Sequence, residues 1–582
     1  EQPSVPLHTS ISLFLLSYCE CTSEVFLVSA KPDTQSSQPW KSQVPKSLAV
    51  SMVHVKDLPV LVRACRLPAV LDETGRYCRA GLAVVLRHIV DRTCEADPRR
   101  KDAASLLGFK KTCLKACAEV SQWTRLCELS IPSAVETLGE PVKVHNDDKI
   151  RRQKLQQQKK NQKKISQDLQ EDQGTDITQP QDSQSADGLE LRAALAKLYV
   201  DSGAVPSTTN RERSDIRKVK TTELEHVFAE GLYFTLTDVV LLPCIHQYLS
   251  SLQSHNASTL SQLPLLLRWY LQVQEVPGVP RAAQACGMAL STPKALTTPS
   301  QVKQESLETT TKEVHFVGGP SGIEAVFSPH PCPSWTLPWD SLPEAVNPTE
   351  GKVSDVRATR KRQQLNNLVA MVTELARPGD TVVDFCSGGG HIGIVLAHTL
   401  PDCQVILIEN KEESLVRGKV RSAEPGLTNI GFIQANLDYF TGPFHIGVAL
   451  HACGVATDMV VEQCIQAGAT FVVSPCCYGF VQNTLKFTFP RSKRFLETLS
   501  YKEHMILCRF ADQTAVQLDI ITVLFDPSPP GKQCMGLVDL DRSWAAETHG
   551  YSVRVMTMEP DSCSPKKNML VDVAGGDNYA TQ

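Results

Sequence analysis

The feature that most constrains this sequence is a strand–glycine turn–helix pattern near residue 385. The apolar run Val382–Phe385 has the length of a buried strand and carries one acid, Asp384. The glycines Gly388–Gly390 follow, and then the apolar run Ile392–Ala397, which has the character of a helix start. Glycine lets the backbone turn sharply and approach a ligand closely. The pattern predicts an open, doubly wound α/β sheet that binds a nucleotide-like cofactor at the carboxyl edge of its strands.

The residues around the turn discriminate among cofactors. Gly388, Gly390 and Gly393 match the dinucleotide-binding spacing, but that spacing alone is weak evidence, and no Gly-Lys-Ser/Thr of a P-loop follows. Asp384 would repel a diphosphate but can bind an ammonium group, directly or through water. S-adenosylmethionine carries an ammonium and a sulfonium, so charge favours this cofactor. The alternative is a Rossmann-like domain that has lost its cofactor.

Four further predicted strands support this assignment. Cys403–Asn410 contains Glu409 about 20 residues past the glycines, where an acid accepts the ribose hydroxyls. Asn436 follows the third strand, where an adenine contact is expected. Apolar strands continue at Ile446–His451 and Thr470–Pro475. Such strands, alternating with helical stretches, are typical of a parallel α/β sheet.

The order of these features resembles class I methyltransferases, although family members often have Asp where Asn436 stands. Val382–Gly390 corresponds to their motif I, and Asn367–Leu375 to their first helix. The resemblance implies cofactor-binding residues in the loop and at two strand ends: Asp384, Cys386, Ser387, Gly388, Gly389, Gly390, Glu409 and Asn436.

Two segments at the carboxyl edge are placed to contact a methyl acceptor: His451–Gly454 with the following Thr-Asp, and Ser474–Gly479. His451 is either a general base for a hydroxyl or a strand-end histidine that orders the loop, and Asp458 is either functional or a helix cap. No DPPY-like tetrapeptide of amide and ring-nitrogen methyltransferases is present. The candidate catalytic residues are His451, Asp458, Cys476, Cys477 and Tyr478.

The same cysteines raise the question of a metal. Zinc sites favour CxxC-type pairs, and we expect the adjacent Cys476 and Cys477 not to present both thiolates to one ion, so no metal is predicted. A small polarisable pair beside the cofactor is the alternative. The HACG…TD and PCCYG pair resembles a methyltransferase subgroup that includes a tRNA ribose 2′-O-methyltransferase. That resemblance implies an RNA hydroxyl as the acceptor.

The N-terminal half carries a second pattern. Thr235 and Asp238 form a variant capping box before the apolar helix Val239–Leu249, and Pro264–Tyr270 and Pro277–Val279 follow. The pattern resembles the helical half of glutathione transferases. Pro68 stands where that family keeps a cis-proline. The Glu-Ser pair that should bind glutathione is replaced by Cys78-Arg79, so the resemblance implies a degenerate catalytic half and no productive glutathione binding. Upstream, apolar spacing predicts an amphipathic helix over Phe109–Leu129.

Length and composition set the domain organisation. A chain of 582 residues is too long for one core. We predict a degenerate thioredoxin-like half (1–100), a glutathione-transferase-like helical domain (101–280) with a disordered insertion near 147–210, a linker (281–327) and a methyltransferase-like domain (328–582). The basic run Lys149–Lys164 is either an RNA-touching or localisation tail or a solvated spacer. Residues 519–530 fit neither domain.

With 59 basic and 63 acidic residues, any nucleic-acid site must be local. The 20 cysteines are scattered, which fits reduced thiols, and no apolar run is long enough to span a bilayer. The order of the two modules resembles a family of two-module proteins, which implies a cytoplasmic protein. Three readings remain: a methyltransferase that recruits RNA or a protein through its helical module, a binding scaffold of retired enzyme folds, and a glutathione transferase.

Overall fold

The computed structural model describes residues 5–29, 39–115, 121–138, 227–255, 263–290, 323–348, 354–484, 486–512 and 530–572. Nearly all of these belong to one compact unit, made of residues 1–136, 227–294 and 317–582. The predicted insertion 147–210, with its basic run, lies outside the described residues, and so does the unplaced segment 519–530 except for Pro530, where α18 begins. No helix within the described ranges is long and apolar enough to cross a membrane.

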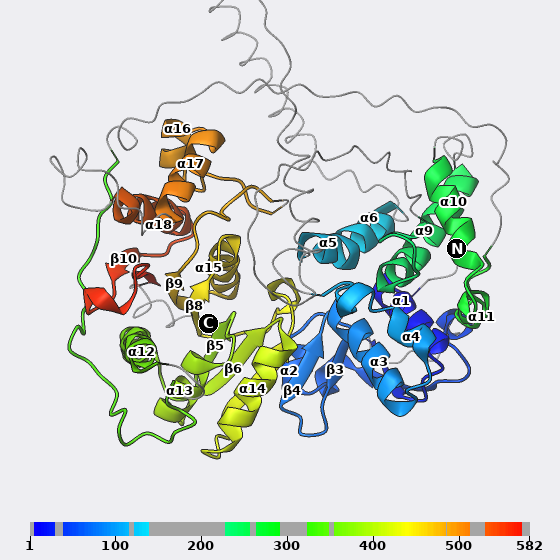
Figure 1. Ribbon diagram of the computed structural model, residues 1–582, viewed down its shortest axis with the longest axis horizontal. Helices are drawn as coiled ribbons and strands as arrows, with labels where there is room; N and C mark the ends of the chain where they lie inside the picture. The colour runs from blue at the N-terminus through cyan, green and yellow to red at the C-terminus, as the bar shows by residue number, and fades with distance from the viewer. Residues whose placement is uncertain are drawn as a thin grey trace, which may run out of the picture. The chain divides into compact units, whose positions relative to one another are not determined.

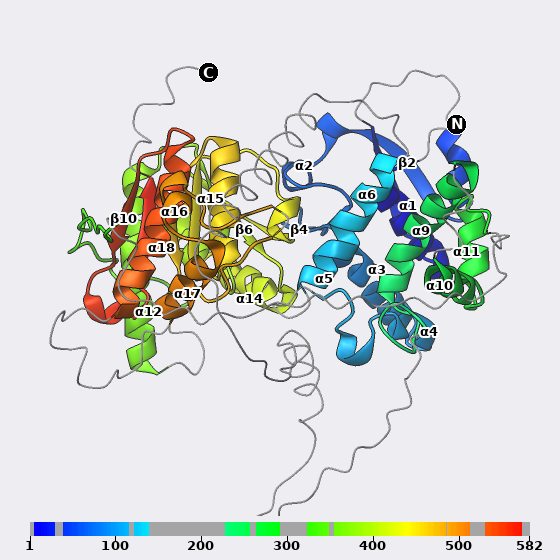
Figure 2. The same cartoon turned by 90° about the horizontal axis from the view of Figure 1, so that it is seen from above.

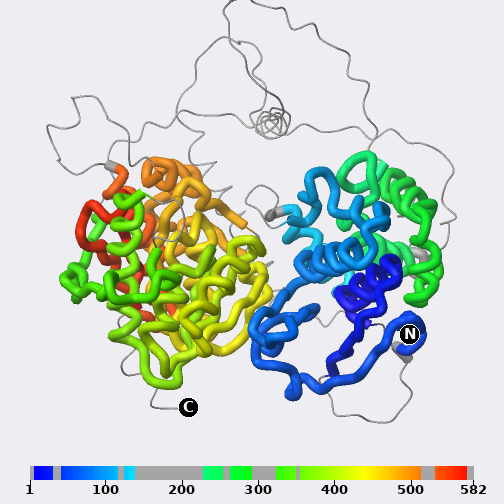
Figure 3. Tube along the Cα trace, turned by 60° about the horizontal axis from the view of Figure 1, so that its bottom comes forward, coloured from blue at the N-terminus to red at the C-terminus, as the bar shows by residue number. Residues whose placement is uncertain are grey.

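The N-terminal half begins with short strands and helices and continues with helices alone. Their bounds are α1 Leu7–Tyr18, β1 Glu24–Ser29, β2 Ala49–His54, α2 Val60–Arg63, β3 Ala69–Leu71, β4 Tyr77–Ala80, α3 Leu82–Ala96, α4 Lys101–Ser105, α5 Ser121–Arg125, α6 Ile131–Leu138, α9 Leu236–His255, α10 Pro264–Gln274 and α11 Val279–Ala285. Helix α1 packs against α9 and α11, which lie far from it in the sequence (Figure 3).

The C-terminal half alternates strands and helices, as the sequence predicted. Its elements are α12 Asp355–Leu375, β5 Thr381–Phe385, α13 His391–Thr399, β6 Gln404–Glu409, α14 Glu412–Ala423, β7 Ile430–Gln434, β8 Ile446–Ala452, α15 Val455–Ala467, β9 Thr470–Pro475, α16 Lys493–Thr498, α17 Tyr501–Asp512, α18 Pro530–Glu547, β10 Val553–Thr557 and β11 Asn568–Asp572.

One sheet organises this half and has the order β10-β11-β9-β8-β5-β6-β7 (Figure 1). Strands β5 to β9 are parallel, and β11 runs antiparallel between β9 and β10. Helices α12, α13 and α14 cover one face, and α15 and α18 the other (Figures 1 and 2). Side chains alternate between faces: Val382 joins one core, and Val383 and Phe385 join the other. This is the predicted doubly wound, Rossmann-like methyltransferase fold.

The sheet does not end at β7. Strand β4 pairs in parallel with β7, which places Cys78 opposite Ile433, and β3 pairs antiparallel with β4. A sheet edge presents unpaired N–H and C=O groups, and β4 satisfies those of β7. Strands β1 and β2 form a separate parallel pair. The four strands observed within residues 1–100, the predicted thioredoxin-like half, are therefore divided between two sheets.

Several local predictions can be compared with the structure. The half of the capping box that Asp238 supplies is confirmed, because its carboxylate accepts from the Thr235 N–H at 2.9 Å, and it also accepts from the Trp269 indole at 2.8 Å. The Leu67–Pro68 peptide bond is cis, as expected. The helix predicted over Phe109–Leu129 is wrong in its first part, where residues with positive φ, including Lys110, break the helix.

Two predicted boundaries also differ. The first helix of the methyltransferase fold is α12, which begins at Asp355, twelve residues before the predicted start. The predicted linker 281–327 is shorter than expected. Helix α11 extends to Ala285, and residues Ile323, Ala325 and Phe327 pack against the C-terminal core.

Candidate functional site

The glycine turn lies between β5 and α13, at the carboxyl edge of the sheet. Gly388 and Gly390 have positive φ angles of 55° and 76°, which explains the use of glycine there. The Gly388 N–H donates to Glu409 Oε2 at 2.9 Å, and the Gly389 carbonyl accepts from Arg421 Nη1 at 3.1 Å. These contacts fix the loop before any ligand arrives.

The outer surface of this loop is open. A Cβ built on Gly388 would meet nothing within 4 Å, and one on Gly389 would meet only His391 Nε2 at 3.9 Å. By contrast, a Cβ on Gly390 would come within 2.6 Å of the Leu407 side chain. Gly390 is therefore required for packing inside the protein, whereas Gly388 and Gly389 leave space where a ligand can approach the backbone.

Asp384 is the next-to-last residue of β5, just before the turn, and is fully buried. Its Oδ2 accepts from the Gly393 N–H at 3.0 Å, while Oδ1 has no hydrogen-bond partner among the residues described. The Ser387 hydroxyl in the same loop is also buried without a partner in the described chain. Burial raises the pKa of Asp384 to about 8. A buried carboxyl oxygen without a partner is costly, so this site favours a ligand with a cationic or hydrogen-bond-donating group.

Cys386, also predicted to bind the cofactor, follows β5 in the same loop. It has a positive φ of 54°, and burial raises the pKa of its thiol. This thiol is therefore neutral at physiological pH.

The other two predicted cofactor residues lie at the next strand ends. Glu409 ends β6, and its second oxygen accepts from the Lys411 N–H at 2.9 Å. Asn436 follows β7, and its amide donates to Glu128 Oε1 at 2.6 Å. Glu128 belongs to the N-terminal half, is buried, and also accepts from the Ala83 N–H at 3.0 Å. Burial raises the pKa of Glu128 to about 7.

Sequence reasoning missed Glu128 and a second residue, Lys361. Lys361 lies on α12, and its charge interacts with Asp384 and Cys476. Loss of water lowers its pKa to about 8. A signal was present, because Lys361 stands four residues before the buried Leu365 and so continues the apolar face of the helix. It was missed because the helix was predicted to begin at Asn367.

The predicted acceptor residues gather where β8 and β9 end. His451 is exposed and has a φ of 73°. Reduced hydration of the ring, followed by the charge of Lys361, lowers the pKa of His451 to about 4, so the imidazole is neutral at pH 7. A neutral imidazole can accept a proton.

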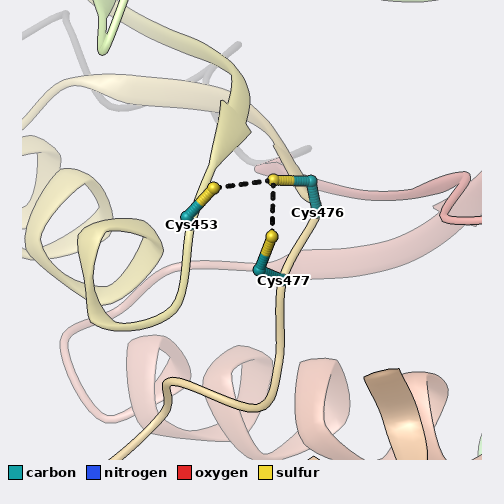
Figure 4. Close-up of side chains that lie close together, drawn as sticks. All are labelled: Cys453, Cys476 and Cys477. Carbon is teal, nitrogen blue, oxygen red and sulfur yellow. Dashed lines mark hydrogen bonds between the residues drawn. The ribbon is translucent and has the colours of Figure 1, made fainter. Parts of the chain in front are cut away.

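Three cysteines converge after β8 and β9 (Figure 4), and the Cys453 thiol donates to the His451 carbonyl at 3.6 Å. The Sγ atoms of Cys453 and Cys476 are 3.1 Å apart, and those of Cys476 and Cys477 are 3.5 Å apart. The hydrogen bond with Cys476 lowers the pKa of Cys453 to about 6 and raises that of Cys476. The thiols of Cys453 and Cys477 both point toward that of Cys476, so the two adjacent cysteines do bring their sulfurs together with a third, contrary to the sequence-based expectation (Figure 4).

Two of the predicted catalytic side chains lie elsewhere. Asp458 is buried in the first turn of α15, where it accepts from Arg542 Nη2 at 2.9 Å. The Tyr478 hydroxyl donates to Asp539 at 2.7 Å and is fully buried. Arg542 also donates to the Gly454 carbonyl at 3.0 Å. Through these contacts α18 holds the loops that follow β8 and β9. Asp458 and Tyr478 therefore position these loops, and their side chains do not lie with the three thiols. Asp458 is also not a side-chain cap, because the N-cap of α15 is Gly454.

The residues that replace a glutathione-binding pair have other partners. Cys78 is buried in β4, and Arg79 forms an ion pair with Glu412 of α14 at 2.8 Å. A cavity of about 50 Å³ lies beside this ion pair and is also lined by His88 and Asn436.

Comparisons with known proteins complete the description. Residues 360–484 match a family model described as a methyltransferase domain. The chain is 57% identical to the glutathione S-transferase C-terminal domain-containing protein of Xenopus laevis, with 98% of each chain covered, and 55% identical to that of Homo sapiens, covering 98% of this chain and 95% of the relative. The Drosophila melanogaster homolog is 31% identical over 98% of this chain and 97% of its own.

Similar solved structures include the magnesium protoporphyrin IX methyltransferase of Synechocystis PCC 6803 with bound SAM. It is 15% identical, has a TM-score of 0.24, and the match covers 38% of this chain and 85% of that chain. An rRNA methylase from Streptococcus thermophilus is 16% identical with a TM-score of 0.18, and the match covers 20% of this chain and 73% of that chain.

Proposed function

The chain belongs to the family of glutathione S-transferase C-terminal domain-containing proteins, and from this premise we propose that it is an S-adenosylmethionine-dependent methyltransferase. The observation that carries the proposal is Asp384. This carboxyl group is fully buried beneath an open glycine turn, and one of its oxygens has no partner in the described part of the chain. A ligand ammonium satisfies that oxygen and favours its ionised form.

The neighbouring residues fit the remainder of the cofactor. Glu409 has carboxylate lone pairs left for ribose hydroxyls after accepting two backbone N–H groups. Asn436 is held in place by Glu128 and retains its carbonyl oxygen for a base amino group. Cys386 and Ser387 form the floor of the turn. When bound, S-adenosylmethionine supplies an electrophilic methyl group on a sulfonium.

For the acceptor we propose a hydroxyl group of RNA. His451 supports this choice because it is the next-to-last residue of β8, at the carboxyl edge, and is neutral at physiological pH, so that its unprotonated ring nitrogen can accept the hydroxyl proton. Lys361, whose pKa is about 8, is mostly protonated at pH 7 and stabilises negative charge as it develops on the acceptor oxygen. The HACG and PCCYG loops, which resemble those of a ribose methyltransferase subgroup, favour the same acceptor.

The N-terminal half then serves recruitment rather than catalysis. Cys78 pairs with β7 through the sheet, and Arg79 forms an ion pair with α14, so neither residue is left to bind glutathione. This supports a module that binds a protein or RNA and does not turn over glutathione. The basic run 149–164 would add salt-dependent RNA affinity without sequence preference. The free thiols throughout the described ranges fit a cytoplasmic protein.

Calorimetry with S-adenosylmethionine tests the cofactor assignment. Wild type should bind, and Asp384→Asn should bind at least ~10-fold more weakly, since a hydrogen bond to a charged group contributes about 1.5–3 kcal/mol. Equal affinity of the two proteins would refute the Asp384 site. Calorimetry with glutathione on the wild-type protein tests the recruitment role, and binding with turnover would overturn it.

Methyl transfer from labelled cofactor to total RNA tests the acceptor. His451→Ala should slow transfer by about 10²–10⁴-fold with cofactor binding retained, and His398→Ala, a histidine on α13, should match wild type. Deletion of residues 149–164 should weaken RNA affinity most at low salt. Labelled protein with unlabelled RNA would identify a protein methyltransferase instead. Bound cofactor with no label in either would indicate a scaffold.

A further inference from the structure

The three-thiol group of Cys453, Cys476 and Cys477 has the geometry of a metal site. All three Sγ atoms lie within 4.8 Å of one another. Two thiolates bound at 2.3 Å to a tetrahedral zinc are about 3.8 Å apart. The two observed sulfur separations of 3.1 and 3.5 Å are slightly shorter than that value, and the third pair of sulfurs lies within 4.8 Å. Small rotations of the side chains therefore suffice to bring the three sulfurs onto one ion.

The loops that carry the thiols are fixed by contacts that do not involve sulfur. The Gly454 N–H donates to the Cys477 carbonyl at 2.8 Å, which ties the loop after β8 to the loop after β9. The Asp512 carboxylate accepts from the N–H groups of Tyr478 and Gly479, both at 2.9 Å. Together with Arg542 on the Gly454 carbonyl, these bonds hold the cysteines in place. Such a supporting shell is typical of metal sites.

Charge around the group is also suitable. Three thiolates around a divalent cation leave a net charge of −1. The Lys566 ammonium, which is paired with Asp512, is close enough to interact electrostatically with Cys453 and Cys477. A cation at this distance offsets the residual negative charge of a metal–thiolate centre.

The arrangement distinguishes a metal site from two simpler possibilities. A disulfide needs two sulfurs, yet three converge here. A buried apolar cysteine pair would not place a third, exposed thiol against it, and Cys453 is exposed. Its exposure also provides a path for an ion to enter. Thiolates select soft or borderline cations, and three protein ligands leave one position of a tetrahedron open.

We propose that Cys453, Cys476 and Cys477 bind one Zn²⁺ ion, with the fourth position open to water at the carboxyl edge of β8 and β9. The site is independent of the methyltransferase assignment, because its ligands, charge and support come from residues other than those that contact the cofactor. It reverses the expectation from sequence, which rested on the assumption that two adjacent cysteines cannot face one ion.

Metal analysis of the full-length protein tests the proposal. Protein purified with reductant, loaded with Zn²⁺ and desalted should retain one more zinc per chain than the triple variant C453S/C476S/C477S. The single variant Cys453→Ser should lose at least nine-tenths of that zinc. Cys94→Ser, which removes a half-buried cysteine of α3 outside the group, should retain it. Circular dichroism would establish that each variant folds.

Cobalt substitution adds a readout of the ligands themselves. Co²⁺-loaded wild type should show thiolate-to-cobalt charge-transfer absorption and the visible bands of a tetrahedral site, and Cys453→Ser should lose most of the charge-transfer intensity. Equal zinc in wild type and the triple variant would overturn the proposal. So would alkylation mapping that finds a Cys453–Cys476 disulfide in metal-loaded protein.

Discussion

Replacing Gly389 with alanine separates cofactor contact from folding. A Cβ at Gly389 would have His391 Nε2 at 3.9 Å as its nearest neighbour, which is ordinary van der Waals contact. The folded protein therefore accommodates it, and the free energy of unfolding should change by no more than about 0.5 kcal/mol. The same methyl group projects into the space where we place the cofactor.

The expected loss of affinity follows from overpacking. An extra methyl group in a filled site costs about 1–3 kcal/mol, which is about 5- to 150-fold in Kd. Gly389→Val, with two more carbons, should abolish measurable binding. The assay is calorimetric titration with S-adenosylmethionine, together with thermal unfolding of the same samples.

The neighbouring glycine provides the matched control. A Cβ at Gly390 would lie 2.6 Å from the Leu407 side chain, on a backbone with a φ of 76°. Left-handed strain of about 1–2 kcal/mol and overpacking of about 1–3 kcal/mol should lower the Tm of Gly390→Ala by roughly 4 °C or more. Wild-type affinity in both Gly389→Ala and Gly389→Val would show that the turn does not face the cofactor.

Three further predictions concern buried charges. The pKa of Asp384 is about 8 in the folded protein and 3.8 ordinarily. The protonated Asp384 side chain therefore stabilises the fold fully below pH 3.8, and this stabilisation is lost as the pH rises through 8. Asp384→Asn should therefore gain Tm relative to wild type between pH 5 and pH 8, and an unchanged difference would contradict the burial argument. The pKa of Glu128, raised from 4.5 to about 7, has the same sign, so the free energy of unfolding by denaturant should fall less between pH 5 and pH 7 in Glu128→Gln than in wild type, while the part due to Asp384 remains; an equal fall in both proteins would contradict this. Arg542→Met should cost about 3–5 kcal/mol in the same assay because it leaves buried acids unpaired, whereas removing the exposed Arg92 should cost less than about 1 kcal/mol; equal effects would refute the network.

The sequence predicted the parts of the site that depend on local structure. Val382–Phe385 is a strand because it is apolar and short, and the turn after it needs glycine where φ is positive. Glu409 and Asn436 were placed correctly at strand ends because parallel strands bring their carboxyl ends to one edge. The Thr235 capping box was recognised because its hydrogen bonds lie within one helical turn.

Patterns that ignore backbone conformation predicted less well. Apolar spacing suggested a helix from Phe109, but spacing carries no information about Lys110 and Leu114, whose positive φ angles end it. The predicted start of α12 was too late because the first turns of this helix are polar, and Lys361, which lies in them, was therefore not recognised as a site residue.

By itself the sequence determined the glycine turn, the acid beneath it and the alternation of strands and helices, since backbone sterics and hydrophobic periodicity act over a few residues. The tertiary structure decided which distant groups meet: β4 on the edge of β7, Glu128 on Asn436, and the thiol of Cys453 on those of Cys476 and Cys477. A strand edge, a buried carboxyl group or a thiol can be satisfied by many partners. The one selected depends on how the whole sheet and its loops pack, which no short stretch of sequence contains.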